Sequence, residues 1–258
     1  MLSLPHILIA IAAAFLAGAI NSVAGGGTLV TFPTLMGLGL PSIAANATST
    51  VAIWPGSLGS MWGFRREIRA TDPGIRLLAI PSVIGGLIGA ILLRRTPAEL
   101  FDHLVPFLIL FATVLFTVQA PIQRRLQSAP HHAPGKRTTT WIVSATLAQF
   151  AVGIYGGYFG AGMSIMMLTV LAFLGLEDIL KMSALTSFFG FCTNGVASIL
   201  FAASHMVVWP YVFAMMFAAL FGGYAAAGIA RRIGKVIVRR FVIAVGFTIA
   251  IVLFIKMF

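Results

Sequence analysis

Charged side chains are scarce in this sequence, and acidic ones are scarcer still. Charged residues make up 9% of the 258 residues, and only six of them are Asp or Glu. A typical soluble domain has about 25% charged residues. Hydrophobic residues make up 59% of the chain, which is more apolar surface than a soluble core could bury. The composition therefore excludes an ordinary soluble domain and predicts a protein that resides in lipid.

The sequence also lacks the residues that common metal and ion sites need. Cys192 is the one cysteine, so an intramolecular disulfide and a Cys-based metal cluster are both excluded. Every acid lies at the end of an apolar run or in a loop, so no midplane carboxylate is available for a proton relay or a sodium cage. The same segments carry no Lys or Arg at midplane. We expect no cofactor, no metal and no cation substrate, whereas backbone dipoles could still hold an anion.

Apolar runs of about 20 residues, the length of a membrane helix, dominate the chain. They predict an all-α polytopic membrane protein of roughly eight long helices, or ten segments if two runs are broken. No Lys or Arg precedes the first run, so we expect a retained membrane segment and not a signal peptide. The runs are 5–36, 42–63, 74–93, 100–118, 141–174, 179–204, 207–230 and 237–256.

The two halves of the chain repeat one another. We expect an N-terminal repeat at 1–118, a polar cytoplasmic linker at 119–140 and a C-terminal repeat at 141–258. Four pairs of motifs keep a spacing of 135 to 138 residues, and internal repeats are typical of secondary transporters. The pairs are Gly25-Gly26-Gly27-Thr28 with Gly160-Ala161-Gly162-Met163, Thr48-Ser49 with Thr186-Ser187, Ser60 with Ser198, and Gly85-Gly86 with Gly222-Gly223.

The basic residues favour an inverted relation between the halves. Their positions beside the apolar runs fit the positive-inside rule and not a nucleic-acid partner. If each run crosses the membrane once, Lys and Arg divide nine to eight between the two sides. If each glycine break turns the chain back, they divide fourteen to three. We therefore expect inverted-topology repeats in a bacterial inner membrane, with both termini periplasmic; full crossing or re-entry of the broken segments stays open.

The glycine-rich breaks are the first candidate for a binding site. Three glycines after Asn21 break a helix and expose backbone N–H groups, which in a membrane must be buried in protein or line a wet cavity. The helix that starts at Thr28 would then point its N-terminus, which attracts anions, into that cavity. Close helix packing is the alternative explanation of the glycines. Trp54-Pro55-Gly56 is predicted to form a kink or hinge.

Hydroxyl and amide side chains near the breaks are the second candidate. They could bind an oxyanion without burying a formal charge, although Ser and Thr in membrane helices also bond to their own backbone. Asn194 could face a cavity or join two helices, and Tyr155 could bind substrate or anchor at the interface. The predicted substrate-binding residues are Asn21, Gly25, Gly26, Gly27, Thr28, Asn46, Thr48, Ser49, Tyr155, Gly160, Gly162, Ser164, Thr186, Ser187 and Asn194.

The ordered motifs resemble the sulfite exporter TauE/SafE family, also called the toluene-sulfonate uptake permease family. That family repeats a glycine-rich motif ending in proline, followed by A-x-x-T-S. Here Gly25-Gly26-Gly27-Thr28-Leu29 leads to Pro33, and Ala45-Asn46-Ala47-Thr48-Ser49 follows. The second copy departs from the pattern at Ala161 and Leu168, which implies that the second half binds less directly. The resemblance implies transport of sulfite, sulfonates or related sulfur-containing oxyanions.

These observations predict a secondary transporter that moves a small anion by alternating access. A membrane enzyme is disfavoured because no paired carboxylates or activated nucleophile lies within a run. An anion channel and a non-transporting membrane subunit are the alternatives. The expected partners are a small anionic substrate and membrane lipid, with no nucleic acid. The identity of the anion, the direction of transport, a coupling proton and a homo-oligomer stay open.

Overall fold

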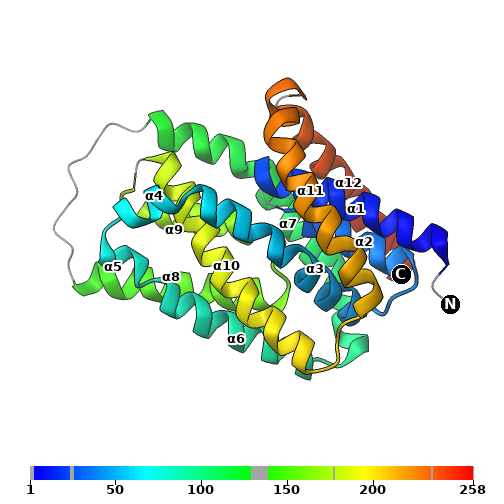
Figure 1. Cartoon of the computed structure of the whole chain (residues 1–258). Helices are drawn as coiled ribbons and strands as arrows, with labels where there is room; N and C mark the ends of the chain where they lie inside the picture. The colour runs from blue at the N-terminus through cyan, green and yellow to red at the C-terminus, as the bar shows by residue number, and fades with distance from the viewer. Residues whose placement is uncertain (1–2, 24–25, 129–138, 177, 234, 258) are drawn as a thin grey trace.

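The structure is a computed structural model that describes residues 3–23, 26–128, 139–176, 178–233 and 235–257. Within these ranges every regular element is an α-helix, as the apolar runs predict (Figure 1). The first half contains α1 (Leu4–Val23), α2 (Thr28–Gly37), α3 (Ser42–Gly63), α4 (Arg65–Ala70), α5 (Pro73–Arg76), α6 (Ala79–Arg95) and α7 (Ala98–Ser128). The second half contains α8 (Thr139–Tyr158), α9 (Met163–Phe173), α10 (Ile179–Ala203), α11 (Trp209–Ile233) and α12 (Lys235–Met257).

Several of these helices are long and apolar enough to cross a membrane, so the chain is a multi-pass membrane protein. Among the described residues, four segments meet that criterion, namely Leu4–Asn21, Pro73–Arg95, Ala98–Gln119 and Leu180–Ala203. The second of them joins α5 and α6 into one span. The remaining helices of the bundle include shorter apolar ones, among them α2 and α9.

Both predicted glycine breaks interrupt a helix in the structure. The first separates α1 from α2, and the second separates α8 from α9. Gly26 has a φ of 100°, while Gly160 and Gly162 have φ values of 78° and 77°. A side chain is strained in this left-handed region, which explains why glycine stands at these positions. Gly25 lies outside the described residues.

Some boundaries match the sequence expectation and others differ. Helix α3 has the bounds of the predicted run 42–63 and continues through Pro55, whose role as a kink or hinge stays a prediction. The short helix α4 follows α3 in a stretch outside the predicted runs, and the predicted run 74–93 is divided into α5 and α6. Asp72 begins α5 by accepting a hydrogen bond from the Gly74 N–H at 2.7 Å. Helix α7 continues to Ser128, ten residues into the segment assigned to the linker.

The halves pack against each other reciprocally (Figure 1). Helix α1 lies along α11, α6 lies along α8, and α3 crosses α10 between these pairs. A Cβ atom on Gly222 would collide with the carbonyl oxygen of Phe15, and one on Gly85 would collide with that of Phe150. These pairs are separated by the same spacing as the sequence repeats, so one close contact occurs twice. Small residues allow such close approach in membrane bundles.

The last long helix of each half, α7 and α12, run antiparallel to each other. The rings of Phe107 and Phe254 lie 5.0 Å apart. Further along α7, Thr113 lies against Gly246, which comes earlier in α12. The contact therefore advances along one helix while it recedes along the other.

Candidate functional site

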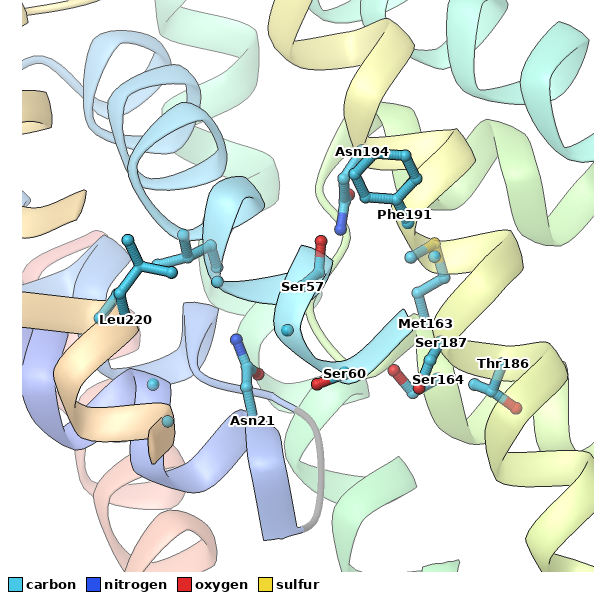
Figure 2. Close-up of a pocket in the computed structure, with 17 residues that line it drawn as sticks. Asn21, Ser57, Ser60, Met163, Ser164, Thr186, Ser187, Phe191, Asn194 and Leu220 are labelled. Carbon is cyan, nitrogen blue, oxygen red and sulfur yellow. The ribbon is translucent and has the colours of Figure 1, made fainter. Parts of the chain in front are cut away.

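A cavity of about 490 Å³ lies where α1, α3, α9, α10 and α11 meet (Figure 2). It therefore takes its walls from both halves of the chain. Five of the predicted site residues line it, and four of those five come from the second half. The five residues are Asn21, Ser164, Thr186, Ser187 and Asn194.

One face of each of two crossing helices forms much of the wall. From α3 the cavity receives Ile53, Gly56, Ser57 and Ser60, which follow the i, i+3, i+4, i+7 spacing of a helix face. The glycine leaves room beside the two hydroxyls. The facing stripe of α10 combines small, polar and aromatic residues, and consists of Thr186, Ser187, Gly190, Phe191 and Asn194.

Two amide side chains lie on opposite sides of the stretch of α3 that carries Ser57 and Ser60 (Figure 2). Asn21 accepts a hydrogen bond from the Gly27 N–H at 2.7 Å. That contact identifies its oxygen, and it leaves its NH₂ group available to a ligand. Asn194 lies beside the second break, where a Cβ on Gly160 would be 3.8 Å from its Oδ1. Each glycine break therefore has an asparagine next to it that also faces the cavity.

The hydroxyls of the cavity differ in what they can offer an anion. Thr186 donates to the Met182 carbonyl at 2.7 Å, and Ser187 donates to the Ser183 carbonyl at 2.9 Å. Their protons are engaged within α10, as the back-bonding alternative predicts. The Ser57 hydroxyl donates to the Trp54 carbonyl. The hydroxyls of Ser60 and Ser164 have no hydrogen-bond partner among the described residues. Two serines and two asparagines are therefore the donors available to a ligand.

The other predicted residues lie outside this cavity, and several have partners in the protein. The Asn46 amide donates to the Tyr158 carbonyl at 3.0 Å, and the Tyr155 hydroxyl donates to the Ala161 carbonyl at 2.6 Å. Thr48 Oγ1 accepts from the Val208 N–H at 3.0 Å. A role for these residues in binding stays a prediction. The group outside the cavity comprises Gly26, Gly27, Thr28, Asn46, Thr48, Ser49, Tyr155, Gly160 and Gly162.

Sequence reasoning did not assign Ser57, Ser60 or Phe191 to the site. The helical spacing of small and polar residues from Gly56 to Ser60 was the signal that could have found the two serines. The same spacing on α10 links Ser187 to Phe191. An aromatic residue in an apolar run carries no such signal by itself.

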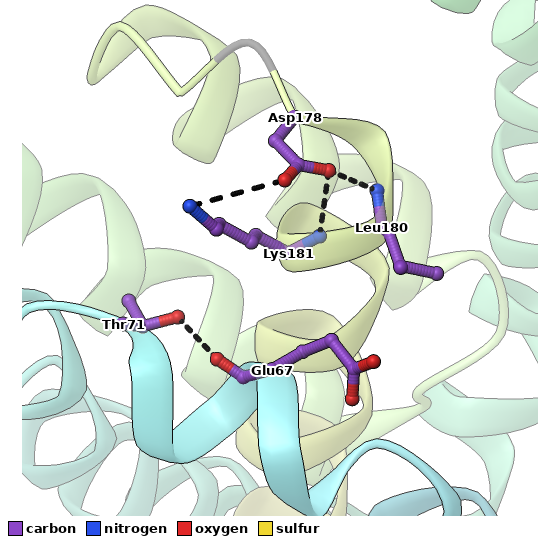
Figure 3. A network of polar contacts seen from close by, with 5 residues as sticks. All are labelled: Glu67, Thr71, Asp178, Leu180 and Lys181. Carbon is purple, nitrogen blue, oxygen red and sulfur yellow. Dashed lines mark hydrogen bonds and ion pairs between the residues drawn. The ribbon is translucent and has the colours of Figure 1, made fainter.

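One end of the cavity is close to a cluster of basic residues. Arg65, Arg66 and Arg69 are exposed on α4, which begins five residues after Ser60. Helix α4 packs against α10. Figure 3 shows Glu67 of α4 together with Leu180 and Lys181 in the first turn of α10. There Asp178 accepts from the Leu180 and Lys181 N–H groups at 2.9 and 3.3 Å, and its other oxygen lies 3.9 Å from Lys181 Nζ (Figure 3).

This end of the cavity therefore has an excess of positive charge. Lys181 is paired with Asp178, whereas the three arginines of α4 face solvent. Thr71 donates to the Glu67 carbonyl at 2.9 Å and closes the turn that follows them. The cavity lining itself contains no Asp, Glu, Lys, Arg, His or Cys among the described residues. It offers no set of ligands for a metal ion.

The family model for Sulfite exporter TauE/SafE matches residues 10–253, nearly the whole chain. The chain belongs to this family. The match confirms the resemblance drawn from the glycine-rich and Thr-Ser motifs. It also agrees with the expectation of a membrane transporter and not an enzyme.

Relatives from three bacteria cover almost the same stretch. A "Probable membrane transporter protein" of Haemophilus influenzae is 28% identical over 236 residues, which is 90% of this chain and 88% of the relative. The "Probable membrane transporter protein ORF9" of a Sinorhizobium species is 27% identical, with 93% and 88% covered. The "Probable membrane transporter protein YfcA" of Escherichia coli K12 is 26% identical, with 90% and 83% covered. No solved structure shows a significant match.

Proposed function

We propose that the protein is a secondary transporter that moves a small anion across the inner membrane by alternating access. The anion is sulfite, an organosulfonate or a related sulfur-containing oxyanion. The observation that carries the proposal is the cavity itself, which is uncharged and presents the donors of Asn21, Asn194, Ser60 and Ser164. The family match and the names of the relatives support transport.

Neutral donors suit the task of binding and then releasing an anion. Hydrogen bonds to a charged group contribute about 1.5–3 kcal/mol each. Several such bonds can replace the water that an oxyanion loses on entry. A buried Lys or Arg would bind the same ion more strongly and slow its release. A cation would find no carboxylate in the cavity lining.

The basic cluster beside the cavity supports an anionic substrate as well. Exposed positive charge at the mouth of a cleft raises the local concentration of anions and their association rate. Arg65, Arg66 and Arg69 occupy such a position. Under the positive-inside rule this mouth faces the cytoplasm.

The packing of the helices supports two repeats of inverted topology. Exchanging the halves carries the α1–α11 contact onto the α8–α6 contact, and it carries α7 onto α12. Because α7 and α12 are antiparallel, the axis that exchanges them is perpendicular to these helices. An odd number of crossings in each half produces that relation, with both termini periplasmic. In this arrangement the substrate site lies at the interface of the repeats.

Flux measurements in proteoliposomes test the proposal. Labelled sulfite and several organosulfonates are supplied separately, with and without a pH gradient. We expect saturable uptake and counterflow of at least one of these anions, and loss of both in the Asn21→Ala/Asn194→Ala variant. Flux that never saturates would indicate a channel, and absence of flux for every anion would contradict the proposal.

A further inference from the structure

The crossing of α3 and α10 contains an aromatic pair that sequence reasoning did not connect with transport. The rings of Trp54 and Phe191 stack with centroids 5.4 Å apart and an interplanar angle of 24°. Phe191 lines the cavity, whereas Trp54 lies behind it and outside the lining. In Figure 2 Phe191 is next to Asn194, one of the available donors.

Trp54 is fixed in place by contacts with α10. Its indole N–H donates to the Phe191 carbonyl at 3.1 Å. A Cβ on Gly195 would lie 3.0 Å from the Trp54 Cζ2 atom, so the absence of a side chain at Gly195 makes room for the indole. The hydrogen bond and the stacking both restrict the position of Phe191, which makes Trp54 a positioning residue.

The opposite side of α10 belongs to a tightly packed region. Thr193 is fully buried there and donates to the Ser82 carbonyl at 3.4 Å. The same threonine would contact a Cβ placed on Gly86 at 2.9 Å. Phe191 faces the cavity and Thr193 faces this packed region, so α10 lies between the two.

The pair also lies close to the proposed pseudo-two-fold axis that relates the two repeats, which we call the exchange axis. The spacing that relates Thr48 to Thr186 places Trp54 opposite Cys192, next to Phe191. Residues near an exchange axis keep their mutual position when the halves move. A seal at this point can serve whichever side of the transporter is open.

We propose that Phe191, positioned by Trp54, forms a hydrophobic barrier across the transport path, which we call the partition. This proposal rests on the proposed transport function, because such a barrier matters only if ions enter the cavity. A bulky apolar side chain at a constriction blocks ions by excluding the water they need. Removing the ring opens a space between α3 and α10 beside Trp54, through which anions leak.

Passive iodide entry into proteoliposomes tests the partition without reference to the natural substrate. The vesicles contain a dye that iodide quenches, and a potassium diffusion potential drives iodide into them. We expect wild-type protein to be tight and Phe191→Ala to raise iodide entry roughly tenfold or more. Phe191→Leu should stay nearly tight, and Trp54→Phe should leak less than the alanine variant. Phe217→Ala on the exposed face of α11 is the control and should match wild type.

Wild-type tightness in a monodisperse Phe191→Ala variant would overturn the partition, even if sulfite transport were established. A leak in that variant would support it, even if no sulfur oxyanion were transported. If Phe191→Ala does not fold, Trp54→Phe decides, because it keeps a ring beside Phe191 while it removes the indole donor and the part of the indole that packs at Gly195. Tightness equal to wild type in Trp54→Phe would then overturn the proposal.

Discussion

Hydroxyls that the repeat places in both halves of the molecule have opposite surroundings. Ser60, Thr186 and Ser187 line the cavity. Their counterparts Ser198, Thr48 and Ser49 are 2%, 0% and 0% exposed, within what we call the packed face. The packed face comprises Asn46, Thr48, Ser49, Ser82, Gln149, Thr193 and Ser198. Similar sequence thus produces a hollow on one side and a sealed interface on the other.

The packed face contains buried polar atoms that have no hydrogen-bond partner among the described residues. Gln149 donates to Ser82 Oγ at 2.8 Å, yet its own Oε1 is buried without a partner among the described residues. Ser198 Oγ and Asn46 Oδ1 are also buried without a partner there. Each such group costs about 1–3 kcal/mol. Under the proposed alternating access, these groups would gain water when the packed face opens and the cavity closes.

The largest expected effect concerns the contacts that both halves share. Gly222→Val should prevent folding, because the side chain would collide with the Phe15 carbonyl and separate α1 from α11. We expect loss of monodisperse protein in size-exclusion chromatography after membrane extraction. Gly59→Val is the matched control, since nothing lies within 4 Å of an added Cβ there. Equal yields from the two variants would contradict the reciprocal packing.

The next effect distinguishes the cavity from the packed face as the site of binding. Asn194→Ala should raise the half-saturation concentration for the transported anion roughly tenfold, since each 1.4 kcal/mol is a factor of ten. Asn46→Ala loses a bond within the packed face and should change the maximal rate more than the half-saturation concentration. Concentration-dependent flux in vesicles separates these outcomes. A larger shift in half-saturation for Asn46→Ala would move the site to the packed face.

A smaller effect is expected from a matched pair of threonines. Thr48→Val leaves the Val208 N–H without its acceptor and should weaken the packed face by about 1–3 kcal/mol. Thr186→Val removes only a bond within α10 and should have little effect. Thermal unfolding in detergent gives the comparison. Identical midpoints for the two variants would show that the contact between Thr48 and Val208 does not support the packed face.

The smallest effect is expected at the mouth. Replacing Arg65, Arg66 and Arg69 with Gln should lower the uptake rate at subsaturating anion a few-fold at low salt. The difference should shrink as salt rises, because the screening length is only about 10 Å at 0.1 M. Uptake rates at several ionic strengths provide the measurement. A deficit that is independent of salt would argue against electrostatic attraction of the substrate.

The sequence predicted the helices of this fold better than the cavity between them. Apolar run length and the glycine clusters located the helices and both breaks, because these depend on local chain properties. The repeat spacing paired Gly85 with Gly222, and the structure shows that both make a close helix contact. Helix α4 was missed because its six residues are too few to carry a periodic signal.

The candidate site could be predicted only in part. Asn21 was a candidate because it directly precedes the first glycine break. Asn194 was a candidate because it is a polar residue in the middle of an apolar run. Thr48 and Thr186 are indistinguishable by sequence pattern, and only the packing of whole helices places one in the cavity and the other in the packed face. Phe191 was not identified because its position depends on Trp54 from a distant segment.

Side-specific cysteine modification tests most directly whether the two faces exchange. In a Cys192→Ser background, single cysteines replace Ser60 and Ser198 in turn, and membrane-impermeant maleimide is added from either side during anion transport. We predict that Ser60→Cys reacts from the cytoplasmic side, and that Ser198→Cys reacts from the periplasmic side only when the transported anion is present. A Ser198→Cys variant that stays unreactive from both sides while transport continues would contradict the exchange of the two faces.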